Sequence, residues 1–174
     1  EDSFGADTVV EAAGEGMDTF DFRALSGAIA VTIEELTITA VAAGSQVIHN
    51  GQQVENLIGG LSADSFIFVD NAKLAGTLDG WIGSDILDFS GVDHNVELLL
   101  TAAGSQDGFA GALAAIAGGF NNINAIIGSS LLDQLTGLDL DSSWEIDGSN
   151  RYLNGANELS FTDIEQAIGS GGVE

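Results

Sequence analysis

The chain has 174 residues and a formal net charge of −24, because only three lysine and arginine residues accompany 27 aspartates and glutamates. Nucleic acids and anionic membrane surfaces are bound by clusters of cationic side chains, so this composition excludes both as partners. With 45% hydrophobic residues the chain is expected to fold as a single domain over 1–174, and without cysteine it forms no disulfide.

The longest nearly apolar stretches, 96–100 and 108–120, are much shorter than the roughly 20 residues that cross a bilayer. We therefore expect no membrane insertion. The sequence begins at Glu1 without a basic leader, which is typical of a processed mature protein or of a piece of a longer one.

Two short sequence units recur along the chain. The first reads apolar, polar, variable, apolar, isoleucine, glycine, small residue, and it occurs at 54–60, 123–129 and 164–170. The second places an aspartate before a short alternating apolar segment and occurs at 6–9, 17–22, 63–68, 84–89 and 132–137. Recurrence of this kind indicates a repeat architecture.

Apolar residues alternate with other residues in many short segments, which is typical of half-buried strands. In chain order, the segments that we predict to be strands are 18–22, 29–33, 36–40, 66–69, 74–78, 86–89, 96–100 and 144–146. Glycine, asparagine and aspartate at the breaks supply the backbone angles that tight corners need, in a chain that has no proline.

One alanine-rich segment, 108–119, departs from this alternation. Its residues Phe109, Leu113 and Ile116 recur at helical spacing, which predicts a short capping or lateral helix over 109–117. A glycine-rich loop is the alternative.

The spacing of the aspartates favours a solenoid. Asp64 and Asp85 lie 21 residues apart, close to the length of one turn of a parallel β-helix, whereas Asp7 and Asp18 are only 11 apart. The turns of a solenoid bury a continuous stack of apolar side chains. The sequence therefore predicts an all-β fold, a parallel β-helix or β-roll-like solenoid, with an antiparallel β-sandwich as the alternative.

Four of the aspartate units resemble the calcium-binding nonapeptide of the repeats-in-toxin (RTX) family, Gly-Gly-x-Gly-x-Asp-x-apolar-x. Residues 80–88 depart from it at Trp81, 59–67 at Ser62 and 13–21 at Ala13, and 128–136 match less well. The order of the units over 58–90 and 135–155 is similar to the repeat region of very large secreted bacterial surface and adhesin proteins.

This resemblance covers about two thirds of the chain. It implies a secreted, extracellular or cell-surface β-solenoid with a structural or adhesive role. In the family motif the aspartate binds calcium and the apolar residue two positions later points inward. The residues that the motif assigns to the core are Phe20, Phe66, Leu87 and Leu135.

Calcium takes six to eight oxygen ligands from carboxylates and carbonyl groups, and glycine-rich corners expose such carbonyls. The candidate metal ligands are Asp64, Asp85, Asp18, Asp7 and Asp133. Asp64 and Asp85 form the best pair because they lie one predicted turn apart. Successive nonapeptides are absent, so any bound ion would be isolated rather than part of a ladder. The alternative is that these aspartates cap turns through their own backbone.

No catalytic residues are predicted, so we expect a protein that is not an enzyme. His49 and His94 lie 45 residues apart without a metal-ligand or catalytic partner, and we predict a solvent-facing turn for each. Neither a Ser-His-Asp arrangement nor a phosphate-binding loop is present in the sequence. A carboxylate pair such as Glu34 and Glu35 has no diagnostic value among 27 acids.

The two ends of the sequence match consecutive parts of one internal segment. Residues 168–174 resemble 58–63, and 2–4 resemble 64–66, which follow directly. We therefore expect one unit of a tandem array, or a protomer that stacks end to end with other copies into fibres. Capping by a fused domain is the alternative.

Exposed aromatic side chains stack on sugar rings, which suggests a second class of function. Trp81 replaces a glycine at a predicted corner, and Trp144 begins a strand-like segment that precedes Tyr152. Packing in or beside the core is the alternative for all three. A calcium-dependent carbohydrate-binding adhesin module, with polysaccharide as its partner, is therefore the alternative to a structural repeat.

Overall fold

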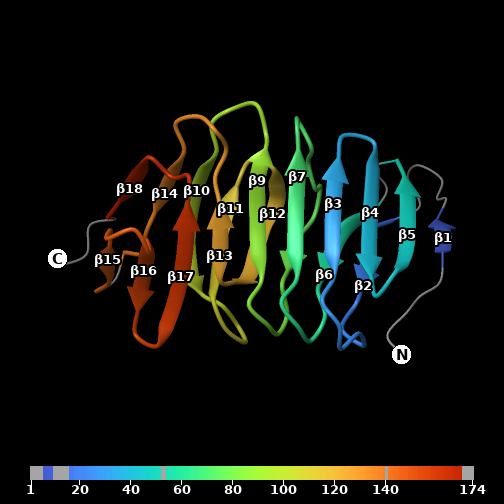
Figure 1. Ribbon diagram of the computed structural model, residues 1–174, viewed down its shortest axis with the longest axis horizontal. Helices are drawn as coiled ribbons and strands as arrows, with labels where there is room; N and C mark the ends of the chain where they lie inside the picture. Colours follow the sequence, from blue (N-terminus) through green and yellow to red (C-terminus); the bar gives the residue numbers. More distant parts are fainter. Residues whose placement is uncertain (1–5, 10–15, 52–53, 140, 170–174) are drawn as a thin grey trace.

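The computed structural model describes residues 6–9, 16–51, 54–139 and 141–169, and of residues 6–9 it describes the backbone (Figure 1). Every regular element in these segments is a strand, and none of them contains a helix. This confirms the predicted all-β class. Of the similarities noted at the two ends of the sequence, residues 2–4 and 170–174 lie outside the described residues.

The strands form two mixed sheets, which we call sheet A and sheet B. In spatial order, sheet A contains β1 (Ala6–Val9), β5 (Ser45–Asn50), β4 (Thr37–Ala42), β3 (Ala30–Glu34), β7 (Ser65–Val69), β9 (Ile86–Gly91), β13 (Ala125–Ile127), β17 (Asn157–Thr162), β16 (Arg151–Asn154) and β15 (Ser143–Glu145). Sheet B contains β18 (Gln166–Ile168), β14 (Gln134–Thr136), β10 (Glu97–Ala103), β11 (Phe109–Leu113), β12 (Ile116–Ile123), β8 (Leu78–Asp79), β6 (Val54–Ile58) and β2 (Asp18–Asp21).

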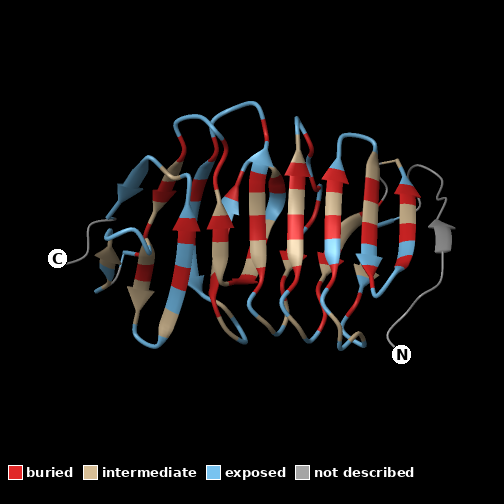
Figure 2. Cartoon of the chain, viewed as in Figure 1, coloured by how far each residue is buried: buried red, intermediate tan, exposed pale blue. Residues whose placement is uncertain are grey.

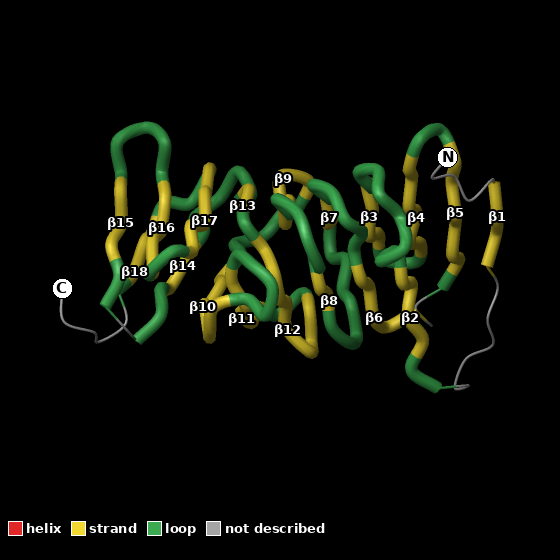
Figure 3. The backbone as a smooth tube through the Cα atoms, turned by 90° about the horizontal axis from the view of Figure 1, so that it is seen from below, coloured by secondary structure: helices red, strands yellow, loops and turns green. Residues whose placement is uncertain are grey.

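The chain passes back and forth between the sheets, and equivalent strands of successive turns pair in parallel. In sheet A this parallel series is β3, β7, β9, β13 and β17. In sheet B, β14 pairs in parallel with β10 on one side and with β18 on the other. The result is a β-solenoid of about four turns, whose two layers face each other in Figure 3.

Three antiparallel meanders are inserted into this solenoid, namely β3 to β5, β10 to β12 and β15 to β17. In the first two, the first strand pairs with the following turn and the third strand pairs with the preceding turn. The antiparallel β-sandwich is the alternative prediction, and antiparallel pairing is present within these meanders.

The core lies between the two sheets, because apolar side chains occupy every second position of the strands (Figure 2). Of the four residues assigned to the core, Phe66, Leu87 and Leu135 are completely buried. Phe20 is only half-buried because β2 is the last strand at its end of sheet B.

The helix predicted over 109–117 is wrong, because this segment forms β11 and the beginning of β12. Phe109, Gly111 and Leu113 are buried in alternation, so the segment has the period of a strand. The ring of Phe120 occupies the place where a β-carbon of Gly111 would lie. The absent side chain at Gly111 thereby allows β11 and β12 to pack closely.

The structure also corrects one of the two histidine predictions. His94 lies exposed in a turn, as expected, whereas His49 in β5 is completely buried. Its ring meets that of Phe20 edge to face, with centroids 6.0 Å apart. His49 occupies an inward position of its strand, which the short apolar pattern around it did not reveal.

Candidate functional site

The buried acidic residues of the described chain lie at the corners of the solenoid. Asp64, Asp85 and Asp133 each precede a strand by one residue, and each is completely buried. Burying a carboxylate is costly unless its oxygens accept hydrogen bonds. The contacts of each carboxylate therefore indicate what it does.

Asp64 joins its own corner to the preceding turn. Its Oδ1 accepts a hydrogen bond from the backbone N–H of Ile29 at 2.9 Å, and its Oδ2 accepts one from the N–H of Gly60 at 2.5 Å. Ile29 directly precedes β3, the strand beside β7. The contact with Gly60 is the turn-capping role considered from the sequence, and the contact with Ile29 adds a link between turns.

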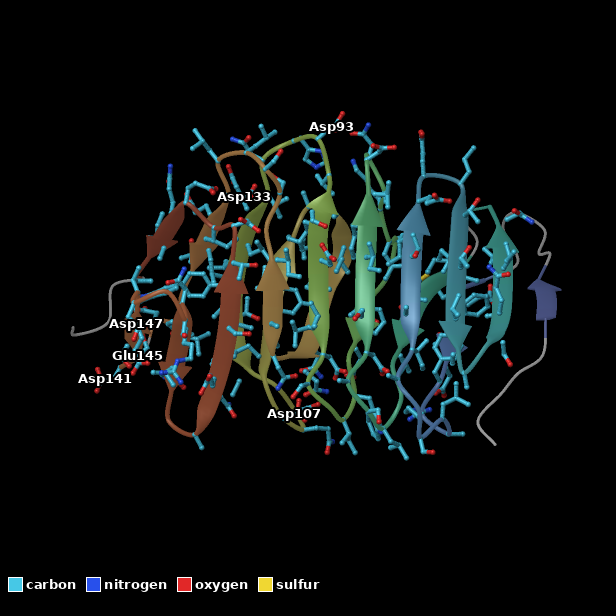
Figure 4. The ribbon with its side chains drawn as sticks, in the orientation of Figure 1. Asp93, Asp107, Asp133, Asp141, Glu145 and Asp147 are labelled. Carbon is cyan, nitrogen blue, oxygen red and sulfur yellow. The ribbon has the colours of Figure 1, made fainter. Side chains whose placement is uncertain are left out.

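Asp133 makes the same arrangement at the other edge of the molecule (Figure 4). Its Oδ1 accepts hydrogen bonds from the N–H of Val96 at 2.6 Å and from the hydroxyl of Ser129 at 3.0 Å. Its Oδ2 accepts the N–H of Ser129. Both oxygens of Asp133 are therefore engaged, as in Asp64.

Asp85 differs from the other two because one of its oxygens lacks a partner. Its Oδ1 accepts the N–H of Asp64 at 2.8 Å, which confirms that the two residues lie in successive turns. Its Oδ2 is buried and has no hydrogen-bond partner among the residues that the structure describes. In Asp64 and Asp133, Oδ2 accepts a hydrogen bond from the N–H of the residue four positions earlier, which is Gly60 or Ser129.

At the Asp85 corner, the N–H of the residue four positions earlier donates to a different carboxylate. Trp81, four positions before Asp85, donates its N–H to Oδ1 of Asp79 at 2.9 Å. Trp81 also has a positive φ of 71°, a strained conformation for a bulky residue. The replacement of glycine by Trp81 therefore coincides with the unpartnered oxygen of Asp85.

A glycine five positions before each buried aspartate leaves room for its carboxylate. A β-carbon on Gly59, Gly80 or Gly128 would lie within 2.7 Å of Oδ2 of the following aspartate and would also collide with a backbone carbonyl of the next turn. These glycines are required by the close approach of two turns. The recurring glycine-to-aspartate spacing is thus explained by packing at the corner.

The electrostatic setting of Asp85 favours its protonated form. Burial raises its pKa to about 7, the hydrogen bond from Asp64 opposes this rise, and the charges of Asp64, Asp107 and Asp79 add to it. Burial also raises the pKa of Asp64, against the effect of its two backbone hydrogen bonds. Asp85 can therefore hold a proton near neutral pH.

Asp107 comes from the loop between β10 and β11 and lies at the same edge of the molecule as this corner (Figure 4). Its Oδ2 accepts a long hydrogen bond of 3.4 Å from the N–H of Gly83, and its buried Oδ1 has no partner in the described segments. Two carboxylate oxygens without partners, from Asp85 and Asp107, thus belong to one electrostatically coupled group.

The two remaining candidate ligands lie elsewhere. Asp18 is half-buried in β2, where its N–H donates to Oε2 of Glu55 at 2.8 Å. Asp7 lies in β1, and its side chain is outside the described part of the structure. Asp133 lies at the opposite edge from Asp107 (Figure 4). The structure therefore brings together Asp64 and Asp85, but not Asp18 or Asp133.

Sequence reasoning missed the polar side chains that continue the links between turns. Oδ1 of Asn124 accepts the N–H of Asp85 at 3.0 Å, and Oε2 of Glu165 accepts the N–H of Asp133 at 2.8 Å. Oδ1 of Asn56 accepts the N–H of Thr77 at 2.9 Å. None of these residues is an aspartate, so the aspartate pattern does not include them and only their register identifies them.

The buried corners differ in how well they fit a calcium ion. Both oxygens of Asp64 and of Asp133 accept N–H groups, which occupy the positions that a cation would need. Within the described segments, no group of three or more His, Asp or Glu side chains is arranged to hold a metal ion. Asp85 and Asp107 retain oxygens with no donor, so the corner at Asp85 fits a cation best.

Two of the three aromatic candidates for sugar binding belong to the core. Tyr152 is completely buried and its hydroxyl accepts the N–H of Leu138 at 2.8 Å. Trp144 packs against Tyr152 and Phe161, with ring centroids 4.7 Å and 5.7 Å away. Trp81 is half-buried at a corner, where the guanidinium of Arg23 lies over its ring, 5.3 Å from the centroid.

Comparison with known proteins assigns no function to this chain, so the function is inferred from the residues described above. No family model matches the chain, and no curated protein sequence matches it closely enough to be called a relative. The described residues contain no helix of the length and apolar character needed to cross a membrane.

Proposed function

We propose that this protein is a non-enzymatic structural repeat of a secreted cell-surface or extracellular-matrix protein, with a β-solenoid related to the RTX-like repeats that its sequence resembles. The observation that carries the proposal is the use of the buried corner carboxylates. Asp64 and Asp133 direct both oxygens to N–H groups of the scaffold. The hydrogen bonds that these carboxylates accept hold adjacent turns together.

Stacked turns of this kind suit a spacer or rod. The turns are joined along the axis by two parallel series of backbone hydrogen bonds and by the corner side chains. Each turn contacts only its neighbours, so such a structure can be lengthened by adding further turns. We therefore propose assembly end to end with other copies or neighbouring repeats, giving fibres.

The negative charge has a role in this proposal. A net charge of −24 keeps rods apart from one another side by side, and salt or divalent ions reduce the repulsion. Lateral aggregation is thereby disfavoured relative to contact at the ends.

Calcium stabilisation is proposed for the Asp85 corner, where Oδ2 of Asp85 and Oδ1 of Asp107 lack donors. A bound divalent ion would neutralise part of the repulsion among Asp64, Asp79, Asp85 and Asp107. The test is a thermal melt at pH 8 and fixed ionic strength, with calcium and with magnesium. We expect calcium to raise Tm more than magnesium in the wild type and equally little in Asp85→Asn. Equal effects of both ions in the wild type would mean screening alone.

The structural proposal is tested by electron microscopy and sedimentation velocity over a range of concentrations, with and without calcium. We expect particles that lengthen in one dimension as concentration rises. Dispersed single particles under all these conditions would overturn the assembly part of the proposal.

A carbohydrate-binding adhesin module is the second candidate, favoured by the half-buried Trp81 at a corner of the solenoid. Its strained backbone holds an indole ring beside the ion pair of Arg23 and Asp21. Flat exposed indoles are suited to stacking on sugar rings. A glycan array probed with the wild type and with Trp81→Ala, with and without calcium, tests this candidate. Binding that disappears in Trp81→Ala would support it, and an array without binding would end it.

A further inference from the structure

The two ends of the solenoid expose strand edges of matching direction. Sheet B ends in β2 on one side and in β18 on the other, and sheet A ends in β1 and in β15 (Figure 1). The pairings make β2 parallel to β18 and β1 parallel to β15. A second molecule translated along the axis would therefore present strands in the same direction as those of the first.

Among the described residues, no strand covers the apolar interior of sheet B beyond β2 at one end or beyond β18 at the other. At one end the inward column runs through Leu98 and Leu135, both buried, to Ala167, which is exposed. At the other end the inward column runs from Leu78 and Leu57, both completely buried, to the half-buried Phe20. A small side chain ends one column and a large one ends the other, so the two ends are complementary in size.

The backbone of β18 has a free side at the same position. The N–H of Gln166 donates to the carbonyl of Asp133 at 3.0 Å, and the carbonyl of Ile168 accepts the N–H of Gly137 at 2.8 Å. Adjacent residues of a parallel strand direct their N–H and carbonyl groups to opposite sides. The N–H and carbonyl of Ala167 therefore point away from β14, toward the open edge.

Exposed edge strands are commonly protected by charged side chains, but β18 carries none. Gln166, Ala167 and Ile168 are all exposed and uncharged, in a chain that has 27 acidic residues. The neighbouring Glu165 is engaged with the N–H of Asp133. The three residues of β18 therefore carry no charge that would repel an incoming strand.

The meanders indicate where the next strand of sheet A belongs. In each of the two internal meanders the first strand, β3 or β10, pairs in parallel with the following turn. In the third meander the last strand, β17, pairs with the preceding turn in the same way as β5 and β12. The first strand, β15, therefore has the position that receives a parallel strand from a following turn.

We propose that the end formed by β15 and β18 docks onto the end formed by β1 and β2 of a second copy of this chain. In this arrangement β18 pairs in parallel with β2, β15 pairs in parallel with β1, and Ala167 packs against Phe20 of the second copy. The inference rests on the proposed end-to-end assembly and specifies its register and direction. Because the two contacting surfaces differ and the second copy is translated along the solenoid axis, the contact repeats and generates a linear polymer.

A first experiment removes the outward N–H of β18. Ala167→Pro deletes this donor without deleting a hydrogen bond to β14, and Ala167→Ser is the matched control because it keeps the donor and the small size. Sedimentation equilibrium is expected to show a dissociation constant about 10-fold or more weaker for Ala167→Pro than for Ala167→Ser. Circular dichroism checks that both variants fold. Equal association of two folded variants would overturn the proposal.

A second experiment determines direction and register by disulfide trapping in a chain that has no native cysteine. When Ala167 lies opposite Phe20, the neighbouring exposed residues Gln166 and Thr19 come within disulfide range across the strand pair. Gln166→Cys and Thr19→Cys are prepared separately and then mixed under mild oxidation. We expect covalent dimers in the mixture and not in either variant alone.

The outcomes separate this inference from the proposed function. Dimers formed by Gln166→Cys alone would indicate tail-to-tail contact and overturn the inference. Assembly of the wild type without cross-linking in the mixture would likewise overturn it, while end-to-end assembly itself survived. A wild type that stays monomeric at all concentrations would refute the assembly on which the inference depends.

Discussion

Replacing Asp85 with asparagine is expected to stabilise the protein at pH 8, although the substitution is made in a completely buried residue. Asparagine keeps an oxygen that accepts the N–H of Asp64. Its amide group places a donor where Oδ2 of Asp85 now has no partner. That donor faces a region made negative by Asp79 and Asp107. The substitution therefore removes a buried charge and leaves the link between turns in place.

The magnitude follows from the pKa of Asp85. Its folded-state pKa of about 7 lies above the ordinary aspartate pKa of 3.8, so the folded protein binds this proton more tightly than the unfolded chain does. The contribution of Asp85 to stability is therefore greatest below about pH 4 and falls as pH rises, until it levels off above pH 7. Each pKa unit corresponds to about 1.4 kcal/mol, so the total loss is on the order of 4 kcal/mol.

The assay is denaturant unfolding followed by tryptophan fluorescence from pH 4 to pH 8 in high salt, which screens the net charge. Asp85→Asn is expected to exceed the wild type in free energy of unfolding by about 2–4 kcal/mol at pH 8 and to match it near pH 4. Asp133→Asn is the matched control. It should lose about 1–3 kcal/mol, because an amide has one acceptor oxygen where the carboxylate uses two. A difference between Asp85→Asn and wild type that did not change with pH would refute the reasoning.

Two further substitutions test the packing of the solenoid. Gly128→Ala would place a β-carbon against the carbonyl of Asp163 and the carboxylate of Asp133, and we expect a loss of about 3 kcal/mol or more in thermal melts. Gly91→Ala is its control, since the nearest atom would lie 3.2 Å away, and it should lose clearly less; equal losses would contradict the close approach of turns at Gly128. His49→Phe should raise the free energy of unfolding by about 1 kcal/mol, because both ring nitrogens of His49 are buried without a partner in the described structure. A loss of stability in His49→Phe, seen by urea unfolding at pH 8, would show that the imidazole makes a contact the described residues do not contain.

The corners of the solenoid show which features a local sequence pattern can predict. The recurring spacing of glycine and aspartate identified Asp64, Asp85 and Asp133 as corner residues, and the family motif that the sequence resembles assigned Phe66 and Leu87 to the core. Both patterns act over a few residues, since a strand alternates its faces and a corner needs room and a polar cap. Such signals can be read without knowing which segments are neighbours.

The predictions for 109–117 and for His49 are wrong because both depend on contacts with residues far away in the sequence. The segment over 109–117 became a strand because β10 and β12 lie on either side of it and Phe120 packs over Gly111. His49 is buried because the first meander turns its face inward. In both cases the deciding contact comes from another strand. Local spacing gave no indication of it.

Short strands, all-β class, corner positions and the inward-facing residues follow from the sequence, because each depends on residues within a few positions of one another. Tertiary structure alone decided which strands pair, where the meanders enter, and which corner aspartate keeps an oxygen without a donor. Hydrogen bonds between turns join residues far apart in the sequence, such as Asp64 with Asp85, 21 positions apart, and Asp85 with Asn124, 39 positions apart. Their partners are fixed by the register of the solenoid. The same motif therefore yields two satisfied carboxylates and one that carries a proton near neutral pH.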